Sequence, residues 1–181
     1  MTDKPQLSAA EDFAGWMHAR DFGTILADPP WQFSNRTGKV APEHRRLSRY
    51  PTLALAEITA IPVASVAAAK SHLYLWVPNA LLAEGLTVMQ AWGFSYKTNI
   101  VWHKIRKDGG PDGRGGGFYM REHSRKPDEL YTIIEACSPA PYLELFARGT
   151  RPHWMQWGNQ VEDYEPDWAT YANHSQATPK S

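Results

Sequence analysis

The sequence predicts an α/β fold, with a mostly parallel sheet and helices on both of its faces. Short apolar runs typical of buried strands alternate along the chain with amphipathic or alanine-rich stretches typical of helices. A length of 181 residues, of which 43% are hydrophobic, suits one compact core. We therefore expect a single domain over residues 1–181, with an N-terminal extension at 1–19, a core at about 20–163 and a C-terminal tail at 164–181.

The first half of the chain predicts two buried strands separated by helix. Apolar residues 24–27 predict a strand that ends at Asp28, because the two prolines that follow cannot donate ladder hydrogen bonds. The alanine-rich residues 52–70 predict helix on both sides of Pro62. Residues 73–77 then predict the second strand.

The next helix is predicted at about residues 80–91, capped by Asn79 and ending near Gly93. Its spacing predicts an inner face made of Leu82, Leu86 and Met89. Residues 98–103 predict a third strand, and the glycine-rich residues 109–117 predict a flexible connector.

The last part of the chain predicts one helix and two strands. Pro127 and two acidic residues begin the helix. Apolar spacing predicts its core-facing stripe, made of Leu130, Ile133, Ile134 and Cys137. Residues 142–146 and 154–157 predict the two strands. Since open parallel sheets bind ligands at the carboxyl ends of their strands, we expect a site where Asp28 and the residues after Phe146 meet.

Composition excludes several kinds of protein. Lys and Arg total 19 and Asp and Glu total 19, so any nucleic-acid contact must come from local clusters of basic residues. A single cysteine excludes an internal disulfide and a multi-cysteine metal site, and the spacing of His103 and His123 gives no metal set, so we expect no metal. No stretch predicts a leader or a membrane span, so we expect a cytoplasmic protein without a membrane partner.

Residues 28–31, Asp-Pro-Pro-Trp, place a carboxylate, two proline carbonyls and an indole together at a strand end. The residue before a proline is held extended, and prolines offer carbonyl acceptors without a competing N–H. Asp28 and the Pro29 carbonyl can accept the two hydrogens of an exocyclic amine, which favours the charge that develops as its nitrogen attacks an electrophile. Trp31 can stack on the base that carries the amine. The alternative is a proline-terminated strand with a solvated aspartate.

Four motifs together resemble the MT-A70-like adenine N6-methyltransferases, which use S-adenosylmethionine. They lie in the order Asp28-Pro29-Pro30-Trp31, His123-Ser124-Arg125-Lys126-Pro127-Asp128-Glu129-Leu130-Tyr131, Glu144-Leu145-Phe146-Ala147-Arg148 and Trp157-Gly158-Asn159-Gln160. The resemblance implies a Rossmann-like methyltransferase fold with a permuted motif order. It also implies catalytic roles for Asp28, Pro29, Pro30 and Trp31, and a cofactor site formed by Asp28, Lys126, Glu144, Arg148, Arg151, Asn159 and Gln160.

The sequence context of Lys126 and Glu144 also indicates what these two cofactor residues do. Lys126 immediately precedes a predicted helix, where its charge and the free backbone N–H groups both favour an anion. Glu144 is an acid within an apolar strand, which is costly unless it is paired. It can hydrogen-bond cofactor hydroxyls or a neighbouring basic side chain.

Two basic segments match in position the loops that frame the target base in relatives. The expected substrate-binding residues are Arg36, Lys39, Arg45, Arg46, Lys104, Arg106, Lys107, Arg121 and His123. Each phosphate that they neutralise would steepen the salt dependence of binding. The alternative is a pair of ordinary solvated loops.

One departure from the family affects the functional prediction. Relatives place a further strand and loop between the segments here at 117–119 and at His123, where this chain has three residues, so its sheet can lack one strand. We expect methyl transfer from S-adenosylmethionine to the N6 amine of adenine in nucleic acid, with DNA favoured over RNA and a homodimer possible. Cytosine N4 methylation needs the same acceptors and stays open. The alternative function is a non-catalytic nucleic-acid-binding partner subunit.

Overall fold

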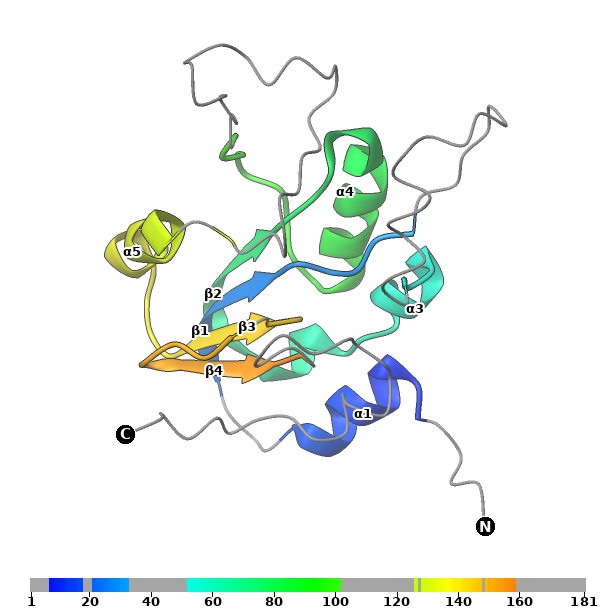
Figure 1. The fold of residues 1–181 in the computed structure, drawn as a ribbon, viewed down its shortest axis with the longest axis horizontal. Helices are drawn as coiled ribbons and strands as arrows, with labels where there is room; N and C mark the ends of the chain where they lie inside the picture. The colour runs from blue at the N-terminus through cyan, green and yellow to red at the C-terminus, as the bar shows by residue number, and fades with distance from the viewer. Residues whose placement is uncertain are drawn as a thin grey trace.

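The computed structural model describes residues 7–17, 21–32, 52–101, 126, 128–147 and 149–158. The elements within these ranges are shown in Figure 1. In chain order they are α1 (Ala9–Trp16), β1 (Phe22–Ala27), α3 (Leu55–Thr59), the 3-10 helix η1 (Val63–Val66), β2 (Ala67–Leu75), the 3-10 helix η2 (Asn79–Leu81), α4 (Leu82–Ala91), α5 (Asp128–Cys137), β3 (Tyr142–Leu145) and β4 (Trp154–Trp157).

The described strands form one parallel sheet in the order β2-β1-β3-β4, and their arrows point the same way in Figure 1. Strand β1 is central, with Ile25 beside Leu73 of β2 and Leu143 of β3. All six residues of β1 are buried, as a strand covered on both faces requires. The chain adds β2 on one side of β1 and then crosses to add β3 on the other. The switch point of the sheet therefore lies between the carboxyl ends of β1 and β3.

Helices cover both faces of the sheet, as the sequence predicts. Alternate residues of β1 point to opposite faces. Ile25 and Ala27 belong to a large apolar cluster that includes Phe13 of α1, Ile58 of α3 and Val88 of α4. Leu26 lies in a second, smaller cluster, whose other buried members are Leu130, Ile134 and Trp154. The core thus also takes in α1, a helix that the sequence analysis did not predict.

The predicted helix at 80–91 is confirmed: α4 ends at Ala91, close to Gly93, which has a φ of 83°. Its predicted cap is wrong, and of its predicted inner face only Met89 is partly buried. Asn79 begins the preceding 3-10 helix instead of capping α4, and Leu82 and Leu86 are exposed. The buried positions are Leu81, Gly85 and Val88. This face is buried because α4 lies close to Val77 at Gly85. A Cβ on Gly85 would lie 2.6 Å from a methyl of Val77.

Two further predictions need correction. Residues 67–70 are strand instead of helix, because β2 begins at Ala67, which pairs with Phe22 of β1; after a shift in register the pairing resumes between His72 and Thr24. Residues 98–101 are the described part of the predicted third strand, and they form no strand. Ile100 and Val101 are exposed. Apolar residues alone do not make a strand, because its backbone groups also need hydrogen-bonded neighbours. Residues 102 and 103 lie outside the described residues.

Helix α5 and strands β3 and β4 are confirmed, but the predicted stripe of α5 is too wide. Leu130 and Ile134 are buried, whereas Ile133 and Cys137 are exposed. The helix meets the sheet along one line of residues spaced four apart, and Cys137 is its last residue. The predicted connector at 109–117 and the predicted tail at 164–181 lie outside the described residues.

Candidate active site

The backbone at the switch point holds Asp28 just beyond β1. Its N–H donates to the carbonyl of Leu145 at the end of β3, 3.4 Å away, and the N–H of Trp76 donates to the carbonyl of Ala27, 2.8 Å away. Asp28 is thus tied to both neighbouring strands. Its side chain is 13% exposed, so the carboxylate is largely buried but reachable.

Beside Asp28, the two proline carbonyls each accept one backbone hydrogen bond. The N–H of Trp31 donates to the carbonyl of Pro29 at 2.9 Å, and the N–H of Leu53 donates to that of Pro30 at 2.8 Å. These bonds fix the turn after β1. Because a carbonyl oxygen has two lone pairs, each can accept one further hydrogen.

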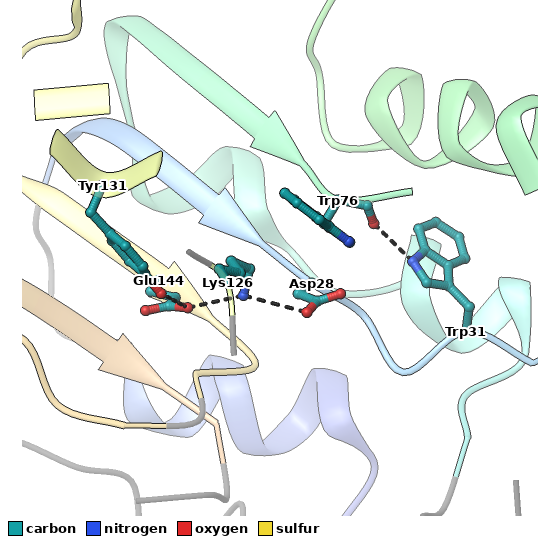
Figure 2. A network of polar contacts seen from close by, with 6 residues as sticks. All are labelled: Asp28, Trp31, Trp76, Lys126, Tyr131 and Glu144. Atoms are coloured by element: carbon teal, nitrogen blue, oxygen red, sulfur yellow. Dashed lines mark hydrogen bonds and ion pairs between the residues drawn. The ribbon is translucent and has the colours of Figure 1, made fainter. Parts of the chain in front are cut away.

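Lys126 lies between two carboxylates, as Figure 2 shows. Its Nζ is 3.4 Å from Oδ2 of Asp28 and donates to Oε1 of Glu144 at 3.0 Å. The side chains of Lys126 and Glu144 are 4% and 3% exposed. Isolated charges at this depth would be costly, so the pairing is what makes their burial possible. Of the two interpretations of Glu144 from the sequence, the structure shows the pairing with a neighbouring basic side chain, and contact of Glu144 with cofactor hydroxyls stays a prediction.

The topology explains how these groups meet. Glu144 of β3 lies beside Leu26 of β1, two residues before Asp28. Lys126 comes just before α5, the helix that packs over this part of the sheet. Three segments remote in sequence therefore place an ammonium and two carboxylates at one end of the sheet.

Tyr131 also belongs to this group, although the sequence analysis gave it no role. Its hydroxyl donates to the same Oε1 of Glu144 at 2.8 Å. Burial raises the pKa of Tyr131, and the negative charge of Glu144 raises it further, so the hydroxyl remains a donor at ordinary pH. The available signal was its place within the motif that resembles the family, on the first turn after Asp128.

Arg151 lies over the ring of Tyr131. Its guanidinium carbon is 4.0 Å from the centre of the Tyr131 ring, and its Nη2 is 2.6 Å from Oδ1 of Asp128. Contact of Arg151 with a cofactor ribose stays a prediction.

Trp31 occupies a more enclosed place than its expected role suggests. The residue is 7% exposed, packs in the large apolar cluster and donates its indole N–H to the carbonyl of Trp76 at 2.9 Å. Figure 2 shows this bond beside Asp28. In the structure Trp31 stabilises the turn after β1 through this hydrogen bond and its packing. Stacking of Trp31 on a base stays a prediction.

The remaining predicted site residues lie outside the described residues. They are Arg148, Asn159 and Gln160 of the cofactor set and all of the substrate set: Arg36, Lys39, Arg45, Arg46, Lys104, Arg106, Lys107, Arg121 and His123. In the part of the chain that the structure describes, no group of three or more His, Cys, Asp or Glu could hold a metal ion. No helix in that part has the length and hydropathy to cross a membrane.

Comparison with known proteins identifies the family. The MT-A70 family model matches residues 22–115 and 117–160, well over half of the chain. The chain belongs to the MT-A70 family. The two matched stretches include the ends of β1 and β3, Lys126 and Glu144, so the described charge cluster lies inside the family's own region. Membership supports an adenine N6-methyltransferase with the Rossmann-like fold that the sheet displays.

Similar proteins include a bacterial and two eukaryotic methyltransferases. The Type II methyltransferase M.MunI from Mycoplasma sp is 26% identical over 80% of this chain and 79% of its own length. An N(6)-adenosine-methyltransferase MT-A70-like protein of Arabidopsis thaliana is 29% identical over 77% of this chain and 24% of its own. The N(6)-adenosine-methyltransferase catalytic subunit METTL3 of Homo sapiens is 27% identical over 78% of this chain and 28% of its own length. The chain thus spans about a quarter of the two eukaryotic relatives.

The comparisons also bear on the short segment before His123. The match to M.MunI extends over 185 positions but involves 80% of this 181-residue chain, so about 40 positions have no counterpart here. The match to the family model is interrupted at residue 116, in the glycine-rich stretch. Neither finding locates the unmatched positions before His123, so a longer segment there in relatives stays a prediction.

Proposed function

We propose that this protein transfers the methyl group of S-adenosylmethionine to the N6 amine of adenine in nucleic acid. The observation that carries the proposal is the largely buried carboxylate of Asp28, held at the switch point 3.4 Å from the ammonium of Lys126 in a chain of the MT-A70 family. Strand ends at a switch point are where sheets of this kind bind their ligands.

The charges at the switch point fit the amino-acid end of the proposed cofactor. That end carries a carboxylate and an ammonium, and the site offers Lys126 for the first and Asp28 for the second. Arg148, Arg151, Asn159 and Gln160 are proposed for the adenosine end. When bound, the cofactor supplies an electrophilic methyl group on a positively charged sulfur.

Asp28 has a second proposed task, at the substrate amine. Its carboxylate and the free lone pair of the Pro29 carbonyl can accept the two N6 hydrogens of an adenine taken out of its stack. These acceptors stabilise the positive charge that develops on the nitrogen as it attacks, and they act from fixed positions. The same acceptors would serve cytosine N4, so the assay must identify the methylated base.

DNA is the proposed nucleic acid. M.MunI, a relative that is matched over 79% of its own length, is named a Type II methyltransferase, whereas the two N(6)-adenosine-methyltransferases are about four times as long as the part that this chain matches. The basic residues of segments 36–49 and 104–126 are proposed to bind phosphates. A cytoplasmic location and a homodimer are further proposals.

The test is the transfer of a labelled methyl group. The protein is incubated with labelled S-adenosylmethionine and with DNA or RNA oligonucleotides, which are then digested to nucleosides. We expect N6-methyladenine from DNA. Labelled N4-methylcytosine would refute the choice of base, and label in RNA alone would refute the choice of nucleic acid.

Asp28→Ala should lower the rate of methyl transfer by at least about a thousandfold, because the amine loses its charged acceptor. The fold should survive, since Lys126 keeps Glu144 at 3.0 Å, and circular dichroism would check this. Asp128→Asn is a matched control, because that acid is 94% exposed. Unchanged turnover in Asp28→Ala would remove Asp28 from the mechanism.

The rival function is a non-catalytic partner subunit that binds nucleic acid. The shorter segment before His123 favours it, and the intact cluster of Asp28 and Lys126 favours the enzyme. Calorimetry with S-adenosylmethionine separates the two, because a degenerate subunit would bind nucleic acid without binding the cofactor.

A further inference from the structure

One oxygen atom at the switch point accepts two hydrogen bonds. Oε1 of Glu144 accepts from Nζ of Lys126 at 3.0 Å and from the hydroxyl of Tyr131 at 2.8 Å, and Figure 2 shows the two donors on either side of the carboxylate. The second donor is neutral, and it competes with the ammonium for the same negative charge.

The Tyr131 hydroxyl is held in place by contacts to its ring. Trp154 meets the ring edge to face, with centroids 5.3 Å apart, and the Arg151 guanidinium lies over it at 4.0 Å. Helix α5 carries the tyrosine and packs on the sheet through Leu130 and Ile134. The hydroxyl is therefore aimed at Glu144 by packing, independently of the ion pair that it adjusts.

We propose that Tyr131 is a positioning residue for the cofactor: by sharing Oε1 of Glu144, it limits the hold of that carboxylate on Lys126 and leaves the ammonium available to the cofactor carboxylate. This inference rests on the proposed function, since it concerns the same site. It adds a residue that acts through Glu144 and Lys126, without touching the cofactor.

The physical basis is the distribution of charge on a buried carboxylate. Each donor that a carboxylate accepts disperses part of its negative charge, and in a poorly solvated place water does not replace a lost donor. Without the Tyr131 hydroxyl, Glu144 would attract the Lys126 ammonium more strongly. A ligand carboxylate would then have to compete for Lys126 against a stronger partner.

The test compares two ligands in the full chain carrying Tyr131→Phe. This change removes the hydroxyl and keeps the ring against Trp154 and Arg151. S-adenosylhomocysteine carries the amino-acid end, and 5′-methylthioadenosine lacks it. Titration calorimetry should show about tenfold weaker binding of S-adenosylhomocysteine, the size expected for a hydrogen bond to a charged group, and unchanged binding of 5′-methylthioadenosine. In the methyl-transfer assay, KM for the cofactor should rise while kcat stays the same.

Tyr142→Phe is the matched control. Tyr142 stacks on Trp154 in the same small cluster, but its hydroxyl donates to the backbone carbonyls of Glu135 and Ser138. Loss of that hydroxyl should leave the affinities for both ligands unchanged. An effect equal to that of Tyr131→Phe would overturn the inference, because it would show that any lost hydroxyl in the cluster disturbs the site.

The other outcomes are also decisive. Equal binding of S-adenosylhomocysteine by Tyr131→Phe and the unaltered chain would overturn the inference and leave the proposed function standing. Equal weakening of both ligands would show a merely structural role for Tyr131 and overturn it too. An unaltered chain that binds neither ligand would overturn the proposed function, and this inference with it.

Discussion

Glu144 and Asp12 are both buried carboxylates, but they have different surroundings. Glu144 lies at the switch point, with the ammonium of Lys126 and the hydroxyl of Tyr131 on one of its oxygens. Asp12 lies on α1, is 7% exposed and accepts the indole N–H of Trp157 at 3.0 Å. Among the described residues, Glu144 forms an ion pair and Asp12 forms none.

The difference separates a chemical site from a structural contact. Burial raises the pKa of Asp12, and the hydrogen bond from Trp157 offsets this in part. At the switch point, by contrast, a buried cation balances part of the negative charge, which is what binding a charged ligand requires. Asp12 instead ties α1 to β4, where Phe13 also meets Trp157 edge to face with centroids 5.2 Å apart.

Lys126→Met should have the largest effect on stability. It leaves the carboxylates of Glu144 and Asp28 close together without their cation, and breaking a buried pair in this way costs about 3–5 kcal/mol. Urea denaturation would measure the loss in the free energy of unfolding. Adding Glu144→Gln to the same chain should restore most of it. A loss below about 1 kcal/mol would mean that the site does not depend on charge balance.

Asp12→Asn should stabilise the protein by about 0.5–1 kcal/mol at neutral pH, a common size for a single stabilising change. The amide oxygen still accepts the Trp157 N–H, and the buried charge is gone. The folded-state pKa of Asp12 is raised above its ordinary value of 3.8, so the native state binds the proton more tightly than the unfolded state. The stability of the unaltered chain therefore falls as the pH rises from about 4 through the folded pKa.

The measurement is the free energy of unfolding of both chains across this pH range. The advantage of Asp12→Asn should be full above the folded pKa and should disappear as the pH falls toward 3.8. An advantage that grows at acid pH instead would contradict the conclusion that burial raises the pKa of Asp12.

Asp128→Asn should have the smallest effect, below about 0.5 kcal/mol, because exposed ion pairs contribute little. Its partner Arg151 is 2.6 Å away, but Asp128 is 94% exposed. The thermal midpoint should change little, and raising the salt concentration should remove what difference there is. A loss as large as that from Lys126→Met would show that Arg151 needs Asp128 to hold Tyr131.

Much of the sheet could be predicted from the sequence. Strands β1, β3 and β4 and helix α5 follow from apolar runs, prolines and acidic first turns, which are local signals. Errors arose where packing decides the outcome. Gly85 lets α4 approach Val77 closely and changes which of its faces is buried, and the pairing of Ala67 with Phe22 makes β2 begin earlier than the sequence predicts.

For the site, too, local features could be predicted from the sequence and contacts between remote segments could not. The sequence places Asp28 at a strand tip and Lys126 before a helix, and it indicates that Glu144 needs a partner. It could not identify Tyr131 as the second donor, because that role depends on how α5 lies over β3. Nor could it foresee Asp12 and Trp157, which are 145 positions apart in the chain.

By itself the sequence determined the strand that ends in Asp28, the helix that follows Lys126 and the family to which their order belongs, because these depend on residues near one another in the chain. Only the tertiary structure decided which buried carboxylate acquires a cation. The order β2-β1-β3-β4 brings Glu144 beside β1 and under α5, where Lys126 and Tyr131 reach it, and it leaves Asp12 with an indole. Charge balance in a protein interior depends on such distances in space, which sequence separation does not reveal.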